Sequence, residues 1–272
     1  GQKSYTGIYT DDVYELTIGN NAQSANVFDN LVCGIQSYNS YITINKNIFK
    51  NIKKARCAIT NPTDFVGLYC ETAIHVAKKP GSLTYTPVVR VTGTDNTNHN
   101  TFINCDKAYY SYKALSTITY NGLSTTTIGF FCRDAINGSM FTNNTITGAK
   151  QGIYVLNSLP EYKNITIQSN TITSVPNAGF GIGITNCKSD ATHLVYIQNN
   201  NNINITNNVA CTGIIATACD NIAITNNPNI NCSSLNTSTY RTSNRGINIS
   251  DCPNSMVKGN TLSKFGTGIW AE

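Results

Sequence analysis

Two polar segments, one repeat apart in the chain, carry the side chains best suited to acid–base chemistry. They combine carboxylates, cations and a histidine: Glu161, Tyr162, Lys163, Lys188, Asp190 and His193. A carboxylate pair beside a cation can donate and accept protons, so these six residues are candidates for contact with a substrate. The alternative, which we favour, is a pair of turns joined by salt bridges. The catalytic residues of any reaction therefore stay unknown from the sequence.

A cluster of tyrosines is the second candidate surface. Tyr109, Tyr110 and Tyr112 stand close together in the chain. Exposed aromatic rings stack on sugars, and a tyrosine hydroxyl adds a hydrogen-bond donor. A strand would instead turn alternate rings toward the core. The cluster therefore indicates either a sugar-stacking surface or ordinary packing.

The residue types that could hold a metal or a cofactor lack the necessary spacing. His75, His99 and His193 stand far apart, and none of the 10 cysteines belongs to a C-x-x-C pair. Zinc-ribbon and haem motifs require such pairs. We therefore expect no metal and no cofactor. The one acidic pair, Asp11 and Asp12, is expected to be solvated in a turn.

The elements that would position these residues are indicated by a recurring glycine–isoleucine pair, in which a cysteine or serine follows the glycine by six residues. The copies begin at Gly34, Gly152, Gly181, Gly213 and Gly246. From Gly152 to Gly246 and on to the Gly-Ile pair at Gly268, the glycines of successive copies advance by roughly 22 to 33 residues, which suits one coil of a solenoid rather than a domain. The repeat therefore predicts a stack of coils.

A second pattern, Ile-x-Ile-x-x-Asn, runs through the same repeats. Its copies end at Asn47, Asn170, Asn208 and Asn227. Side chains alternate along a strand, so both isoleucines face one side. Strands this short cannot bury that side alone, and each is expected to pair in parallel with its copy in the next coil, about 4.8 Å away. The asparagines are expected to adopt left-handed turns and to hydrogen-bond one another along the axis.

These repeats resemble the right-handed parallel β-helix of the pectin-lyase-like superfamily, in the generic form found in many secreted bacterial proteins. The resemblance extends from Gly7 to Ile269. It implies an all-β fold, a right-handed parallel β-helix solenoid with side loops. We expect a single β-helix over 1–272, with irregular, loop-bearing coils over 61–140.

Within that irregular stretch, strands are expected at Val88–Val91 and Thr101–Ile103. Helical signals are almost missing from the chain, and the stretch 64–77 is the one place where a helix is considered. The last coil opens at Gly268 and is not completed. We therefore expect that the chain is a segment of a longer polypeptide, or that a partner caps this end.

Charge and hydropathy limit the kinds of partner that the chain is expected to have. Only 12% of the residues are charged and the net charge is +5, without a long basic run, so we expect no nucleic-acid ligand. No apolar run approaches the roughly 18 residues that a membrane-spanning helix needs. The neutral polar residues of the repeats suit hydrogen bonding to sugars as well as solubility.

The β-helix fold hosts many functions, so the resemblance leaves function open. Our first hypothesis is a non-catalytic stalk, adhesin or carbohydrate-contacting segment of a larger secreted or cell-surface bacterial protein, located outside the cell and partnered by polysaccharide. The second is a polysaccharide lyase or glycoside hydrolase, which would allow calcium as a cofactor; a phage tailspike is a weaker third. Arg133-Asp134 and Arg90 come nearest to the residues that a lyase needs, without a family motif around them. Whether the chain is an enzyme stays uncertain.

Three cysteines, Cys187, Cys219 and Cys252, occupy the repeat position that Ser40 and Ser158 fill in other coils. A small side chain stacked in or near the core explains this exchange. We therefore predict that these three thiols are reduced and buried. The other cysteines follow no regular spacing, so disulfides among them stay possible.

Overall fold

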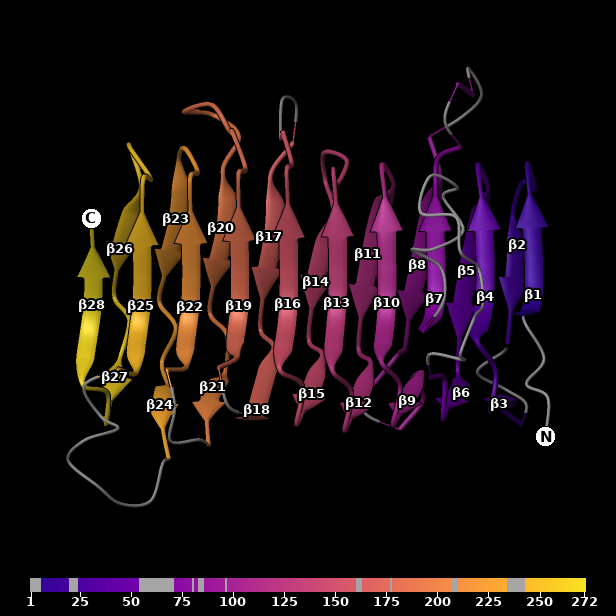
Figure 1. Cartoon of the computed structure of the whole chain (residues 1–272). Helices are drawn as coiled ribbons and strands as arrows, with labels where there is room; N and C mark the ends of the chain where they lie inside the picture. The colour runs from indigo at the N-terminus through magenta and orange to yellow at the C-terminus, as the bar shows by residue number, and fades with distance from the viewer. Residues whose placement is uncertain are drawn as a thin grey trace, which may run out of the picture.

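The repeated apolar segments form short strands, and each strand pairs in parallel with its copy one coil later, as the computed structural model shows (Figure 1). The structure describes residues 6–19, 24–53, 71–79, 81–82, 86–95, 97–159, 163–176, 178–206, 210–233 and 243–272. The elements assigned within these ranges are all β-strands. None of the described residues belongs to a helix with the length and apolar character needed to cross a membrane.

Three parallel sheets run along the solenoid. The first sheet contains β1 (Thr6–Asp11), β4 (Cys33–Tyr38), β7 (Thr72–Ala77), β10 (Lys107–Tyr112), β13 (Ile128–Arg133), β16 (Gln151–Leu156), β19 (Phe180–Thr185), β22 (Thr212–Thr217), β25 (Arg245–Ser250) and β28 (Thr267–Ala271). The second contains β2 (Leu16–Ile18), β5 (Tyr41–Asn45), β8 (Val88–Thr92), β11 (Leu115–Thr119), β14 (Met140–Thr142), β17 (Ile165–Gln168), β20 (Val195–Gln198), β23 (Ile222–Thr225) and β26 (Met256–Lys258). The third contains β3 (Asn26–Asp29), β6 (Asn47–Lys50), β9 (Thr101–Ile103), β12 (Gly122–Ser124), β15 (Thr145–Thr147), β18 (Thr171–Val175), β21 (Asn202–Ile205), β24 (Ile230–Cys232) and β27 (Leu262–Ser263).

The coil is right-handed. In Figure 1 the first-sheet strands point upward in front, the second-sheet strands point downward behind them, and successive coils advance to the left. A chain that rises in front, descends behind and advances to the left winds as a right-handed helix. Together with the parallel pairing throughout, this confirms the predicted fold class: an all-β, right-handed parallel β-helix solenoid.

The core consists of rows of apolar side chains, and each row takes one residue from every coil. Each row places like on like, and full burial of one such side chain contributes about 1.5–3 kcal/mol. In the third sheet, for example, the rings of Phe28, Phe49 and Phe102 stack at 4.8 and 5.0 Å. The first-sheet row is Ile8, Ile35, Ile74, Tyr109, Phe130, Ile153, Ile182, Ile214, Ile247 and Ile269.

A ladder of asparagines closes the turn between the second and third sheets. Its members are Asn26, Asn47, Asn100, Asn121, Asn144, Asn170, Asn200, Asn227 and Asn260. Each amide bonds the amide of the next coil. The side-chain Oδ1 of Asn170, for instance, accepts from the Nδ2 and the backbone N–H of Asn144, both at 3.0 Å. The predicted hydrogen-bonded ladder is therefore confirmed.

Two details of that ladder differ from the prediction. The left-handed residue is the one before the ladder asparagine, for example Ser169 with φ 55°, which leaves the amide free to point inward. Ile203 and Ile205 lie in β21 of the third sheet, and the ladder position of that coil belongs to Asn200. The assignment of this copy was therefore wrong, and Asn208 lies outside the described residues.

Parts of the stretch 61–140 continue the three sheets. The strands expected at Val88–Val91 and Thr101–Ile103 are confirmed as β8 and β9. In the stretch where a helix was considered, Thr72–Ala77 is strand β7, because Ile74 and Val76 alternate into the core and are fully buried. Residues 64–70 lie outside the described residues.

The cysteine and serine row lies at the turn from the first sheet to the second. Cys187 donates its backbone N–H to the Cys219 sulfur at 3.4 Å, as Ala135 does to the Ser158 hydroxyl at 2.9 Å. No disulfide is assigned among the cysteines that the structure describes, which are Cys33, Cys105, Cys132, Cys187, Cys211, Cys219, Cys232 and Cys252. Cys57 and Cys70 lie outside the described residues. Cys187 and Cys219 are fully buried, whereas Cys252 is only partly buried, so the prediction of full burial is wrong for Cys252.

The exposures predict an order of thiol labelling. In the native protein we expect an alkylating reagent to modify Cys252 first and to leave Cys187 and Cys219 unmodified until the protein unfolds, because reaction requires access to a thiolate. The order depends on access, because the contact with Cys219 raises the pKa of Cys252 well above its usual range, just as the contact with Cys187 raises the pKa of Cys219. Mass spectrometry of timed digests measures the order. Rapid native labelling of Cys187 would contradict the stacked row.

Candidate functional site

The turn from the first sheet to the second presents one residue per coil in a left-handed conformation. In successive coils Lys113, Asp134, Asn157 and Asn186 have φ between 51 and 55°. The backbone N–H of each donates to the last carbonyl of the next first-sheet strand, as Asp134 does to Leu156 at 2.8 Å. Left-handed backbone is one that asparagine and aspartate tolerate. The turn row is thus held rigidly.

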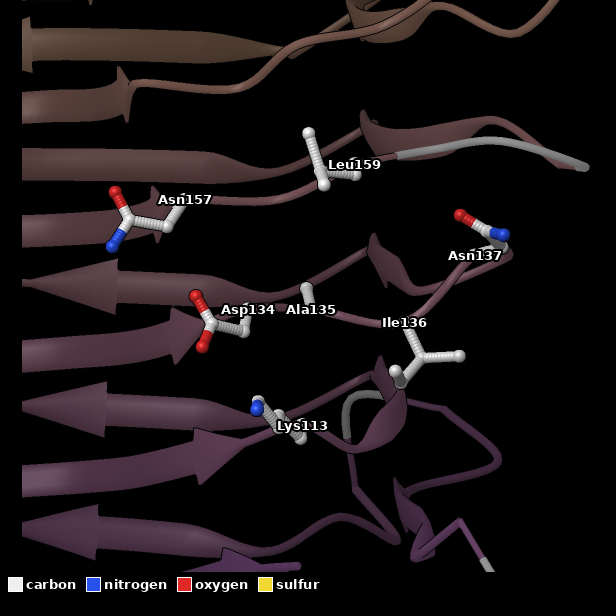
Figure 2. Close-up of a pocket in the computed structure, with 7 residues that line it drawn as sticks. All are labelled: Lys113, Asp134, Ala135, Ile136, Asn137, Asn157 and Leu159. Carbon is white, nitrogen blue, oxygen red and sulfur yellow. The ribbon is translucent and has the colours of Figure 1, made fainter.

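A pocket of about 440 Å³ lies against this row and the loops that follow it (Figure 2). Its size falls within the roughly 300–1,000 Å³ of typical small-molecule sites. Figure 2 shows Asp134 between Lys113 and Asn157 on one side, with Asn137 on the other. The lining residues are Lys113, Asp134, Ala135, Ile136, Asn137, Asn157 and Leu159.

The pocket combines a positive and a negative side chain with amides and an apolar wall. Lys113 Nζ lies 5.2 Å from the ring centroid of Tyr112, and the Arg133 guanidinium carbon lies 5.8 Å from the same centroid. These two cations therefore flank one aromatic ring, an arrangement that cation–π attraction favours. Asn157 Oδ1 accepts from Asn186 Nδ2 at 2.9 Å, which leaves the Asn157 amino group available to a ligand. The arrangement suits a ligand with several hydroxyl groups.

Aromatic side chains continue from the pocket across the outer face of the first sheet. Tyr110, Phe131 and Tyr154 occupy the same register position in β10, β13 and β16. Tyr110 and Phe131 meet edge to face at 5.2 Å, and Phe131 stacks on Tyr154 at 5.1 Å. Phe180 of β19 then meets Tyr154 at 5.4 Å with the ring planes 64° apart. The half-buried rings of Phe131, Tyr154 and Phe180 extend the candidate surface beyond the pocket.

The two polar segments named from the sequence do touch. Lys188 donates its N–H to the Ser158 carbonyl at 3.0 Å, and Leu194 donates to Asn164 Oδ1 at 2.8 Å. Glu161 and Tyr162 lie outside the described residues. Lys163 is exposed beside Gly138, near the rim of the pocket. These bonds join the ends of the two segments, and the shared surface expected for Glu161, Tyr162, Lys163, Lys188, Asp190 and His193 stays a prediction.

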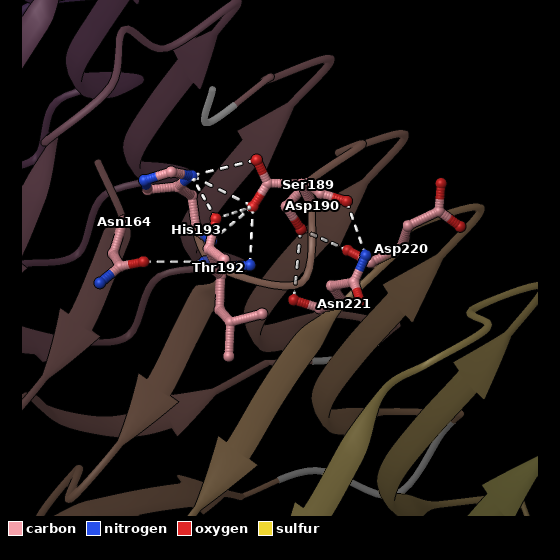
Figure 3. Close-up of polar contacts among 8 residues, drawn as sticks. Asn164, Ser189, Asp190, Thr192, His193, Asp220 and Asn221 are labelled. Carbon is pink, nitrogen blue, oxygen red and sulfur yellow. Dashed lines mark hydrogen bonds and ion pairs between the residues drawn. The ribbon is translucent and has the colours of Figure 1, made fainter. Parts of the chain in front are cut away.

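The charged side chains of the second segment are occupied locally, and Figure 3 shows the contacts of Asp190 and His193. Lys188 Nζ lies 3.4 Å from Asp220 Oδ2, in the next coil. Asp190 Oδ1 accepts from the backbone N–H groups of Thr192 and His193, each at 2.7 Å, and Oδ2 lies 3.0 Å from His193 Nδ1. Hydrogen bonds from His193 and Thr192 hold the pKa of Asp190 well below its usual range. This carboxylate fixes a loop and stays ionised, so it is unsuited to donate a proton.

The three tyrosines do not form an exposed platform. Tyr109 belongs to the inward row, and its hydroxyl lies 2.8 Å from Ser116 Oγ in the core. Tyr110 faces outward but is 3% exposed, between His75 and Phe131. Tyr112 is half-buried beside the pocket. The platform interpretation is therefore wrong for Tyr109 and Tyr110, because alternation and stacking cover both rings.

Sequence reasoning missed most of the pocket. Lys113 and Asp134 precede Ala114 and Ala135, which fill the cysteine or serine position of the repeat, so these coils lacked the motif that marks the turn. Asn157 and Asn186 do precede Ser158 and Cys187. The residue that precedes the cysteine or serine of the repeat was therefore the feature of the sequence that could have identified the pocket. Among the described residues, no group of three or more histidines, cysteines or carboxylates is placed to hold a metal.

Comparison with known proteins identifies no family for this chain. No family model matches it, and no curated protein matches it significantly. One solved structure that aligns with it is QnrB1, described as a plasmid-mediated fluoroquinolone resistance protein. The alignment has a TM-score of 0.23 and 8% identity and covers 96% of this chain and 91% of that one. A likeness of this size supports no argument about function, and the fold assignment depends on the strand pairing of the chain itself.

Proposed function

We propose that the chain is a non-catalytic, carbohydrate-contacting β-helix module of a secreted or cell-surface bacterial protein, on a pectin-lyase-like scaffold. The observation that carries the proposal is the pocket beside the turn row, in which Asp134 stands between Lys113 and Asn157. Its extracellular location is part of the same proposal. The neutral, asparagine- and threonine-rich surface of the repeats is compatible with it.

The chemistry of the pocket suits a sugar. A carboxylate accepts two or more hydroxyl protons, an amide both donates and accepts, and an ammonium donates to ring or hydroxyl oxygens. Asp134, Asn157 and Lys113 provide one of each. Ile136 and Leu159, the latter 53% exposed, offer an apolar surface for the C–H face of the ring. A small set of polar groups on an apolar wall is typical of ligand sites.

Replacing Asp134 by asparagine tests the pocket directly. We expect Asp134→Asn to weaken binding about 10- to 100-fold, because a hydrogen bond to a charged acceptor contributes about 1.5–3 kcal/mol. Asparagine tolerates the left-handed backbone of this position, with φ 51°, so the turn is expected to remain intact. Binding is measured by calorimetry with the sugars that a polysaccharide panel identifies.

Asp251→Asn is the matched control. Asp251 is an exposed residue of the same turn row, with φ 50°, and it does not line the pocket. We expect its replacement to leave binding unchanged. Equal effects of the two variants, or no bound sugar on the panel, would contradict the proposed site. Release of unsaturated products or of reducing ends from the panel would instead establish the lyase or hydrolase alternative.

A further inference from the structure

Phe180 lies flat on the first sheet because the strand beneath it has a glycine. At the register position where neighbouring strands carry Phe131 and Tyr154, β19 carries Gly183. A Cβ atom at Gly183 would lie 2.5 Å from Cε2 and 2.8 Å from Cζ of Phe180. The ring of Phe180 therefore occupies the space that a side chain at Gly183 would need.

The orientation of this ring differs from that of the rings before it. Phe131 and Tyr154 are nearly parallel, with 18° between their planes, and they follow one another along the solenoid axis. Such a stack turns ring edges, not faces, toward solvent. The Phe180 plane is 64° from that of Tyr154, and one face of it covers Gly183. The other face of this half-buried ring therefore points outward.

The side chains around Phe180 are uncharged. Tyr154 and Ile215 pair with Gly183 beneath the ring, and hydrogen-bonding side chains flank Phe180 itself. Gln151 and Thr212 pair with Phe180 in the strands on either side, and Thr185 follows on the same strand. All three are half-buried, so each reaches the surface. An aromatic face framed by an amide and hydroxyls fits the apolar face and the hydroxyl groups of a pyranose ring. The occupant that this chemistry favours is a sugar.

We propose that Phe180 is a second subsite of the site proposed above, and that the ligand is an oligosaccharide. Gly183, under the ring, precedes Asn186 by three residues, a span of about 10 Å at about 3.3 Å per residue. Asn186 in turn donates to Asn157, which lines the pocket in the neighbouring coil. One sugar residue cannot bridge this span. The inference rests on the proposed function and adds the length of the ligand to it.

The test measures affinity against chain length. With the best oligosaccharide of the panel and its monosaccharide unit, we expect the wild-type protein to bind the oligosaccharide at least about fivefold more tightly, the scale of one aromatic contact. Phe180→Leu, which keeps apolar volume but removes the ring face, is expected to abolish that advantage and to leave monosaccharide binding unchanged. Gly183→Ala, which displaces the ring, is expected to act in the same way. Tyr196→Leu, a half-buried tyrosine on the outer face of the second sheet, is the control and should change neither affinity.

The outcomes separate the two proposals. If Asp134→Asn weakens binding but neither Phe180→Leu nor Gly183→Ala does, the second subsite is wrong and the pocket stands. Equal affinity of the wild-type protein for the monosaccharide and the oligosaccharide would also refute the second subsite. If the wild-type protein binds no sugar, both proposals fail.

Discussion

Replacing Asn170 by alanine is expected to lower the free energy of unfolding by about 3 kcal/mol. The Asn170 side chain accepts from Asn144, and its Nδ2 donates to the Phe141 carbonyl at 2.9 Å and to Asn200 Oδ1 at 3.0 Å. The residue is fully buried, so no water would replace the side-chain bonds that alanine removes, although Asn200 Oδ1 would keep its bond from the backbone N–H of residue 170. A buried group left without its hydrogen bond costs about 1–3 kcal/mol. Urea unfolding measures the change.

An exposed asparagine contact between coils offers the matched control. Asn229 Nδ2 donates to Asn202 Oδ1 at 3.1 Å. This bond also joins the amides of two asparagines in successive coils, but it is exposed to solvent. We expect Asn229→Ala to change the free energy of unfolding by less than about 0.5 kcal/mol, because water replaces the lost bond. Similar losses in the two variants would show that burial of the ladder contributes little.

The repeat patterns predicted the fold because each pattern arises from a contact between equivalent residues of successive coils. The glycine of the Gly-Ile pair shows why: a Cβ atom at Gly152 would lie 2.4 Å from the carbonyl oxygen of Gly181 in the next coil. The contact is close but admits alanine, as Ala73 shows opposite Gly34. Where alanine replaces glycine, the motif disappears from the sequence although the coil persists. That exchange is one reason why the stretch 61–140 had no visible repeat.

The error at Asn208 has a different cause. Alternation of apolar residues identifies a strand and its inward face, but not which of three sheets contains it. Ile203 and Ile205 satisfy the alternation in the third sheet as well as they would in the second. The true copy reads Val195-x-Ile197-x-x-Asn200, with valine in the first place. The Asn ladder, rather than the isoleucine pair, is the feature that fixes the register.

The pocket was beyond reach of sequence reasoning for a physical reason. Lys113, Asp134 and Asn157 share no residue type, and they become neighbours only when the register of three coils is known. Their common property is the left-handed backbone of the turn, which lysine seldom adopts. The segments that were found, around Lys188 and Asp190, stood out by charge. In the structure those charges serve the loops themselves.

Acid is expected to destabilise the protein through His75, and His75→Phe is expected to remove much of that sensitivity. His75 is fully buried and stacks on Tyr110 at 5.3 Å with 11° between the rings. Burial, with a smaller effect of the Lys107 charge, lowers its pKa to about 3. An unfolded histidine titrates near about 6.5. Between these values the unfolded chain binds a proton that the folded chain does not.

The sign of the effect follows from that difference. Below about pH 6.5 each further unit of acidification favours the unfolded state by up to about 1.4 kcal/mol, so about 2–3 kcal/mol is expected at pH 4.5. Phenylalanine keeps a flat ring against Tyr110 and cannot titrate. Urea unfolding between pH 7 and 4.5 should therefore show a steep fall for the wild-type protein and a shallower one for His75→Phe.

The variant His193→Gln tests whether the acid sensitivity depends on the buried position of His75 or on the presence of any histidine. The His193 side chain is 30% exposed and lies apart from the buried surroundings of His75, so the large fall between pH 7 and 4.5 is expected to persist in this variant. Parallel curves for the wild-type protein and His75→Phe would mean that His75 takes up its proton in the folded state. Since a charged imidazolium needs solvent or a countercharge, that result would place water or an anion beside β7, against the burial described here.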